Sequence, residues 1–245
     1  FDETRFLRLP ESSQHLLEFL SIIYTPITAN SLSKLSPVAI PLTQLHSLLN
    51  ELVQTGWLTA SKTQHYACAP GIGDALTQHS VRGGRFDAWA KVVDLHLSPE
   101  QPKNWWAGQQ VWTHVEAALR DLRLQVLLGD NKNVQLLLER AGKQYAQHPL
   151  YQPHPWLHIW GNPPDNAWFE LLPQATFLQL IAPVYLTLAA QDMSIQVVGL
   201  WQYCQKLLHD HNADGNPLWE ICGATYYEQM FLRGQSDETS RMPTS

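Results

Sequence analysis

The sequence predicts an all-α protein with one small β-hairpin wing: a winged helix-turn-helix followed by an irregular, repeat-like α-helical body. Apolar residues recur at helical spacing through most of the 245 residues, and the period becomes an alternating one in residues 57–68. That alternating stretch directly follows the last of three short helical segments. Three short helices closed by a hairpin are the order of a winged helix-turn-helix.

The first two helices are identified by their apolar spacing and by the residues at their ends. Apolar residues three and four apart predict a helix over residues 12–24, after the turn residue Pro10. Either Thr28 or Asn30 can cap a second, shorter helix. Pro37 ends that helix, because the residue before a proline is pushed out of the helical region.

A third helix and a hairpin complete the predicted winged-helix domain, which covers residues 1–81. Pro41 suits the first turn of this helix, leucines follow at intervals of three and four, and Gly56 is a natural C-terminal stop. Residues 57–60 and 64–68 then alternate like two strands around a polar turn. The third helix is the one that a winged helix usually places in the major groove of DNA.

The rest of the chain is expected to form a helical body over residues 82–233 and a frayed tail or linker over residues 234–245. The helices expected after the hairpin cover residues 73–80, 86–97, 105–128, 131–147, 174–190, 192–210 and 218–232. Gly129 and Asp130 join the third and fourth of these, which are both amphipathic. An antiparallel pair of this kind is the unit of tetratricopeptide-like solenoids, although no repeat of about 34 residues is visible.

Composition excludes several classes of protein. With 44% hydrophobic and 16% charged residues, the chain is neither disordered nor a coiled coil. It has no apolar run of membrane-spanning length and no secretory signal, so we expect a cytoplasmic protein without a membrane partner. Because the chain begins with Phe1 and not Met, we expect it to be a piece of a longer polypeptide.

The net charge of −6 is unevenly distributed. Residues 82–143 hold nine Lys and Arg against seven Asp and Glu, whereas residues 144–245 hold three against nine. DNA or another polyanion would therefore prefer the middle of the chain. The acidic last third is better suited to packing or to contacts with protein.

Candidate nucleic-acid contacts begin on the third helix, whose expected solvent face carries no Lys or Arg. Gln44 and Asn50 can pair with adenine edges. Phosphate contacts normally supply most of the affinity, and only Lys62 in the wing and Lys34 before the third helix are near enough to provide them. The alternative, which the lack of cations favours, is a winged helix that serves packing or protein docking.

More basic residues follow the hairpin. Arg120 and Arg123 lie three apart on one expected helix, so they can grip a phosphate backbone or an acidic partner. Intramolecular pairing with Glu116, Asp121 and Glu139 is the alternative and the commoner use of such residues. The complete set of nucleic-acid-binding candidates is Gln44, Asn50, Lys62, Arg82, Arg85, Arg120 and Arg123.

No metal, cofactor or catalytic residue is expected. The three cysteines lack C-x-x-C spacing, so they indicate neither a zinc site nor a disulfide framework. His154 and His158 are four apart, but Pro155 limits a helix there to its first turn. Phosphate-binding loops and nucleophile motifs do not occur in the sequence. We therefore expect a module that acts by binding and is not an enzyme.

Two families place a winged helix ahead of helical pairs, and this chain resembles both. Residues 49–58, with Tyr66 and Pro70, resemble the third helix, glycine and wing of bacterial winged-helix domains. Residues 117–130 and 162–173 resemble the N-terminal part of bacterial Swi/Snf-type helicase-like ATPases. That resemblance implies a non-catalytic accessory region of a motor whose ATP hydrolysis and DNA translocation reside elsewhere in the polypeptide.

The second family is the STAND class of signal-transducing ATPases, in which a winged helix leads into tetratricopeptide-like repeats that hold an inducer. Resemblance to this class implies a ligand-sensing or protein-docking segment of a transcriptional regulator. The expected partners are therefore DNA, other domains of the parent protein or an accessory protein.

Overall fold

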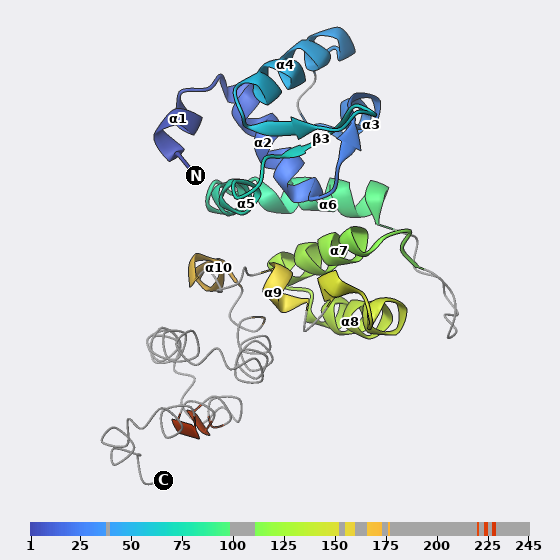
Figure 1. Cartoon of the computed structure of the whole chain (residues 1–245). Coiled ribbons are helices and arrows are strands. Elements are labelled where there is room, and N and C mark those ends of the chain that lie inside the picture. The colour runs from blue at the N-terminus through green and yellow to red at the C-terminus, as the bar shows by residue number, and fades with distance from the viewer. Residues whose placement is uncertain are drawn as a thin grey trace. The chain divides into compact units, whose positions relative to one another are not determined.

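The structure of the chain, a computed structural model, is mostly helical and contains a small three-stranded antiparallel sheet (Figure 1). It describes residues 1–37, 40–98, 111–151, 155–159 and 166–172, together with residues 176, 220, 223, 224, 227 and 228. The predicted fold class, all-α with one small β wing, is confirmed.

The central helix of the winged part is α2 (Glu11–Ile23), which confirms the helix predicted for residues 12–24. Residues 16–23 are all buried, so this half of α2 has no solvent face. Burying one large aliphatic or aromatic side chain stabilises a fold by roughly 1.5–3 kcal/mol, and this run therefore anchors the core. A five-residue helix that was not predicted, α1 (Glu3–Leu7), precedes it and is too short to show a helical period.

The second predicted helix is confirmed as α3 (Ala29–Leu35). The Thr28 hydroxyl accepts a hydrogen bond of 3.2 Å from the Ser31 backbone N–H, so Thr28 and not Asn30 is the N-cap. The helix ends two residues before Pro37, as that proline predicts.

The third predicted helix is confirmed as α4 (Leu42–Gln54). Pro41 is its N-cap, with a ψ of 141°, and therefore stands just outside the first turn in which the sequence places it. Gly56 adopts a φ of +79°, a left-handed conformation that glycine adopts without steric cost, and turns the chain toward the hairpin.

The predicted hairpin is confirmed as β2 (Leu58–Ala60) and β3 (His65–Cys68), which pair antiparallel with Leu58 opposite Cys68. A third strand, β1 (Ile27–Thr28), pairs antiparallel with the other edge of β3. Because β1 has two residues, it shows no alternating pattern, and the sequence does not predict it. The order α2, β1, α3, α4, β2, β3 is that of a winged helix.

Four longer helices follow the hairpin: α5 (Gly73–Arg82), α6 (Phe86–Leu97), α7 (Val115–Leu128) and α8 (Asn131–Tyr145). The helix predicted for residues 105–128 begins later than expected, because residues 111–114 are not helical; residues 105–110 lie outside the described part. Within the non-helical stretch, Trp112 turns its indole N–H to the Asp121 carboxylate, 2.7 Å away. This tertiary contact accompanies the shorter helix.

The pair α7 and α8 is antiparallel, as predicted. Gly129, with a φ of +76°, and Asp130 make the turn between the two helices. At the other end of the pair, the side chain of Gln144 in α8 accepts a hydrogen bond of 2.9 Å from the Val111 N–H and donates one of 2.6 Å to the Trp112 carbonyl. The end of α8 therefore lies beside the residues that lead into α7.

The core forms where α2 packs against β3, α5, α6 and α7. In Figure 1, α5 and α6 cover the side of α2 that faces away from α4. Residues 117–127 of α7 are all buried, including the charged residues Arg120, Asp121 and Arg123. Because buried charges need partners, this helix carries polar contacts as well as apolar ones.

The chain divides into two compact units: Phe1–Leu128 with Lys132–Ala146, and Gly129–Asn131 with Gln147–Ser245. The sheet and α1 to α7 all belong to the first unit, as does almost all of α8. The expected boundary between residues 81 and 82 lies at the end of α5, within this unit.

The second unit contains a 3-10 helix, η1 (Pro149–Tyr151), and the short helices α9 (Trp156–Ile159) and α10 (Asn166–Leu171). Apart from single positions, the helices predicted for residues 174–190, 192–210 and 218–232 and the tail 234–245 lie outside the described residues. Among the helices that the structure describes, none has the length and apolar character needed to cross a bilayer.

Candidate functional site

The exposed face of α4 is the surface that a winged helix presents to a partner. Its opposite face is apolar and buried, through Leu45, Leu49 and Leu52. The exposed polar residues of α4 are Thr43, Gln44, Ser47, Asn50, Glu51 and Gln54. A shallow hollow of about 440 Å³ lies on this face, lined by Thr43, Gln44, Ser47, Leu48 and Glu51. The candidates Gln44 and Asn50 therefore lie on a polar face whose charged member is an acid.

The wing presents Lys62 on an ordered turn. The backbone N–H of Ser61 donates a hydrogen bond of 2.9 Å to the His65 carbonyl, and the His65 N–H donates one of 3.1 Å to the Ser61 hydroxyl. Gln64 completes the turn with a φ of +55°. Lys62 is exposed, and so is Arg82, the last residue of α5. Both of these candidates are at the surface.

Arg85, another candidate, binds the carboxylate of Glu18 in α2. Its Nε donates to Oε2 at 2.8 Å and its Nη2 to Oε1 at 2.7 Å, a bidentate pair. The Glu18 side chain is 0% exposed, and His79 of α5 brings Nδ1 to 2.5 Å from Oε1. The hydrogen bonds to Glu18 raise the pKa of Arg85 above its ordinary value. Arg85 therefore joins the start of α6 to α2, and His79 brings α5 to the same Glu18 carboxylate.

Arg120 belongs to a buried network centred on Asp121. Its Nε donates to Asp121 Oδ1 at 2.8 Å, and its Nη2 donates to the Leu97 carbonyl at 2.7 Å. The same carboxylate accepts hydrogen bonds from the Ser98 hydroxyl at 2.8 Å and from the Trp112 indole at 2.7 Å. Burial raises the pKa of Asp121, while Arg120 and the hydrogen-bond donors oppose that shift.

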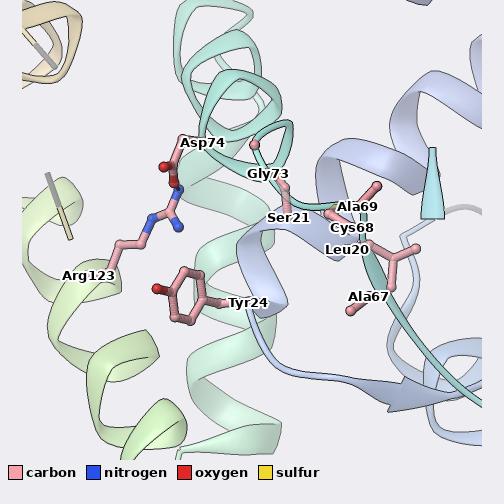
Figure 2. A pocket seen from close by; sticks show the side chains of 10 residues that line it. Leu20, Ser21, Tyr24, Ala67, Cys68, Ala69, Gly73, Asp74 and Arg123 are labelled. Carbon is pink, nitrogen blue, oxygen red and sulfur yellow. Dashed lines mark ion pairs between the residues drawn. The ribbon is translucent and has the colours of Figure 1, made fainter. Parts of the chain in front are cut away.

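Arg123 is also buried, with 3% of the residue exposed. Its Nη2 lies 3.0 Å from Oδ1 of Asp74, and its guanidinium carbon lies 5.0 Å from the centre of the Tyr24 ring, a cation–π contact. Figure 2 shows Arg123 reaching toward Asp74 above the Tyr24 ring. The three residues come from α7, α5 and the C-terminal end of α2.

The structure therefore changes the set of candidate contacts. Arg120 and Arg123 do not form a surface pair that could grip a phosphate backbone, because both guanidinium groups are used inside the fold. The intramolecular alternative describes them better: Arg120 pairs with Asp121 as that alternative expects, and Arg123 pairs with Asp74. We drop these two and Arg85 from the candidate interface, which leaves Gln44, Asn50, Lys62 and Arg82.

Arg123 and Asp74 lie on the wall of a pocket of about 190 Å³ (Figure 2). Its lining comes from α2, β3, α7 and the entry to α5: Leu20, Ser21, Tyr24, Ala67, Cys68, Ala69, Gly71, Gly73, Asp74 and Arg123. Burial raises the pKa of the Cys68 thiol to about 12, so the thiol is protonated at neutral pH. Burial also raises the pKa of Tyr24. The charged groups of this wall are thus one guanidinium and one carboxylate.

Sequence reasoning missed Glu18, Asp74 and Tyr24. A signal for Glu18 exists, because it is the one charged residue in the apolar run 16–20, and a charge in such a run needs an internal partner. No comparable signal marks Tyr24, whose φ of +63° is seen only in the fold.

Within the described part of the chain, no three His, Cys, Asp or Glu side chains are grouped so that they could hold a metal ion. The histidine pair of the sequence lies partly outside that part, since His158 is described and His154 is not. No family model, no curated protein and no solved structure matches this chain.

Proposed function

We propose that this chain is a non-catalytic, winged-helix accessory module that docks onto a protein surface through the exposed face of α4. The observation that carries the proposal is the character of that face, which is polar, almost uncharged and shallowly hollow. The partner would be another domain or an accessory protein of a helicase-like or STAND-type parent, as the two resemblances imply.

Desolvation favours a protein partner. The centres of protein interfaces are depleted of charged residues, whereas duplex binding depends on Lys and Arg that neutralise phosphates. The α4 face brings Glu51 and no cation, and the arginines Arg85, Arg120 and Arg123 are held within the fold. Burying a neutral polar face against a protein costs less hydration energy than burying a charged face. The same face gains little affinity for DNA, because it brings no cation to the phosphates.

Engagement of nucleic acid is the second candidate, and one arrangement favours it. Gln44 and Asn50 are exposed on the helix that would enter the major groove, and Lys62 stands at the tip of the wing. With Lys62 and Arg82 as the phosphate contacts, affinity would fall only about tenfold between about 50 and 200 mM salt.

Site-specific photocrosslinking distinguishes the two candidates. A photoreactive residue is placed at Ser47 on α4 and, as a matched control, at Gln135, an exposed position of α8. In cells that make the protein, we expect a discrete protein adduct from position 47 and none from position 135. Adducts to nucleic acid from position 47 would favour the second candidate, and identical adducts from both positions would contradict docking through α4.

Fluorescence anisotropy with labelled single- and double-stranded DNA provides the complementary test. For a protein-docking face, we expect no binding at micromolar protein. The second candidate, nucleic-acid binding, would be favoured if DNA binding weakens about tenfold over the same salt range. That binding should then be lost when Lys62→Ala and Asn50→Ala are combined.

A further inference from the structure

The pocket of Figure 2 combines two opposite charges with an apolar wall. On one side, Nη2 of Arg123 lies 3.0 Å from Oδ1 of Asp74. On the other side lie Leu20, Ala67 and Ala69, from α2 and from β3 and its end. Figure 2 shows these apolar side chains across from the charged pair. A ligand in this pocket would therefore meet charge at one end and hydrocarbon at the other.

The two charges have different exposure. The Arg123 side chain is 4% exposed, whereas that of Asp74 is 49% exposed, so the pair spans the boundary between interior and solvent. Charge interactions are stronger on the interior side of such a boundary than in water. An isolated anion would be attracted by Arg123 and repelled by Asp74, and an isolated cation would experience the reverse. A molecule that carries both charges a few ångströms apart complements both residues.

The size of the pocket limits the ligand. A volume of about 190 Å³ corresponds to roughly six water molecules, at about 30 Å³ each. Sites for drug-sized ligands are larger, from about 300 Å³ upward. The protonated Cys68 thiol adds no charge to the wall. The part of a ligand that enters the pocket is therefore compact, with room for a short apolar side chain.

Tyr24 provides an independent indication. It ends α2 with a φ of +63°, a conformation that is unfavourable for a bulky residue, and its ring lies beneath the Arg123 guanidinium. Residues held in such conformations cluster at ligand clamps and switch regions. Here the strained residue is itself part of the pocket lining and positions the cation.

We propose that this pocket binds a small zwitterion, an α-amino acid with a short apolar side chain. The ligand carboxylate binds Arg123, its ammonium group binds Asp74, and its side chain packs against Leu20, Ala67 and Ala69. In an α-amino acid the two charged groups sit on one carbon, which matches the close approach of Arg123 and Asp74. This site is separate from the α4 face and does not depend on docking by that face.

Thermal unfolding of the full chain tests the proposal with L-valine and the other short apolar amino acids as probes. Isobutylamine, which lacks the carboxylate of valine, and isovalerate, which lacks its ammonium group, are the matched single-charge analogues. At a ligand concentration ten times Kd, we expect the melting temperature to rise by about 3 to 6 °C with an amino acid. We expect no rise with either analogue.

Two variants test the assignment of residues by calorimetric titration. Asp74→Asn is expected to weaken amino-acid binding at least tenfold, because it removes the charged partner of the ammonium group. Asp87→Asn is the matched control, an equal change of charge in the first turn of α6, and should leave Kd unchanged. Ala69→Leu fills the apolar side while keeping both charges, and should abolish binding.

The proposal is overturned if no short apolar amino acid binds, or if isovalerate or isobutylamine binds as tightly as valine. It is equally overturned if Asp74→Asn or Ala69→Leu has the same Kd as the wild-type chain. None of these results affects the proposed docking function of the α4 face, which the anisotropy and crosslinking experiments test independently.

Discussion

Glu18 and Arg85, separated by 67 residues in the sequence, form a bidentate ion pair that joins the start of α6 to α2. Glu18 is wholly buried on α2, between the apolar residues Leu17 and Phe19. A buried carboxylate without a partner is strongly destabilising, so the pair determines where the start of α6 lies against α2. His79 extends the same joint to α5.

Arg85→Ala is expected to lower the free energy of unfolding by about 3 kcal/mol, because it leaves the Glu18 carboxylate buried without its bidentate partner. Urea denaturation followed by circular dichroism measures this loss. Arg82→Ala, at an exposed position three residues earlier, is the control and should change the same quantity by less than about 0.5 kcal/mol. Equal losses in the two variants would show that the ion pair does not stabilise the fold.

Gly83→Ala is expected to disturb the same ion pair. A Cβ at this position would lie 2.6 Å from Nη2 and 2.7 Å from the guanidinium carbon of Arg85, which is held in place by Glu18. Overpacking of this kind costs about 1–3 kcal/mol in the free energy of unfolding. At Gly73 the added Cβ would lie 3.6 Å from Cys68, an ordinary contact, so Gly73→Ala is the control and should not destabilise.

The origin of the Gly83 effect is tested in the Arg85→Ala background. Without the guanidinium, the three atoms nearest to the added methyl group are removed, and most of the cost of Gly83→Ala should disappear. An undiminished cost in that background would mean that the backbone at Gly83, and not Arg85, opposes the substitution.

The elements that the sequence predicts correctly depend on local signals. The apolar period marks α2, the Thr28 hydroxyl caps α3 within three residues, and Gly56 ends α4 through its own backbone conformation. Each of these effects acts over one or two helical turns, so neighbouring residues in the sequence are enough to predict it. The two-residue strand β1 is too short for any such signal.

The sequence favours internal pairing of Arg120 and Arg123, and it correctly offers Asp121 as a partner of Arg120. The partner of Arg123 could not be predicted, because it lies far away in the sequence. Only the fold brings Asp74 of α5 to Arg123 of α7. The late start of α7 likewise goes with contacts distant in the sequence, since the Val111 backbone N–H and the Trp112 carbonyl both bind the side chain of Gln144 in α8.

Trp112→Phe should destabilise the chain in a pH-dependent way. The substitution removes the indole N–H that donates to Asp121 Oδ2 at 2.7 Å, and leaving a buried acceptor short of a donor costs about 1–3 kcal/mol. Burial holds the pKa of Asp121 above its ordinary value of 3.8, and the Trp112 hydrogen bond opposes that rise. The variant therefore raises the folded-state pKa further.

When the pKa of a carboxyl is higher in the folded than in the unfolded state, the protein loses stability as the pH rises from the unfolded-state pKa to the folded-state pKa. The loss in free energy of unfolding caused by Trp112→Phe should therefore be larger at pH 7 than at pH 4, as measured by urea titrations at both pH values. Trp57→Phe is the control, since the buried Trp57 indole N–H has no hydrogen-bond partner in the described structure. Its deficit should not change with pH, and a pH-independent deficit for Trp112→Phe would contradict the assignment.

Cys68 should be a very slow nucleophile in the folded chain. Its Sγ lies 3.8 Å from the Leu17 carbonyl, and burial raises its pKa to about 12, from an ordinary value of 9.0. At pH 8.5 the thiolate is then a minute fraction of the thiol, and alkylation should be at least about a hundredfold slower than in concentrated urea. Replacing Cys204 and Cys222 by serine makes Cys68 the single reporter.

The pH dependence of that reaction distinguishes a raised pKa from simple obstruction. With a pKa of about 12, the alkylation rate of native Cys68 should climb about tenfold per pH unit from pH 7 past pH 9, because the thiolate fraction keeps growing. A rate that levels off near pH 9 would show an ordinary thiol that is merely shielded. A raised folded-state pKa also costs stability as the pH rises from 9 toward 12, since the unfolded thiol ionises first. Cys68→Ala should therefore remove that loss, and the same urea titrations at pH 8 and pH 10 measure it.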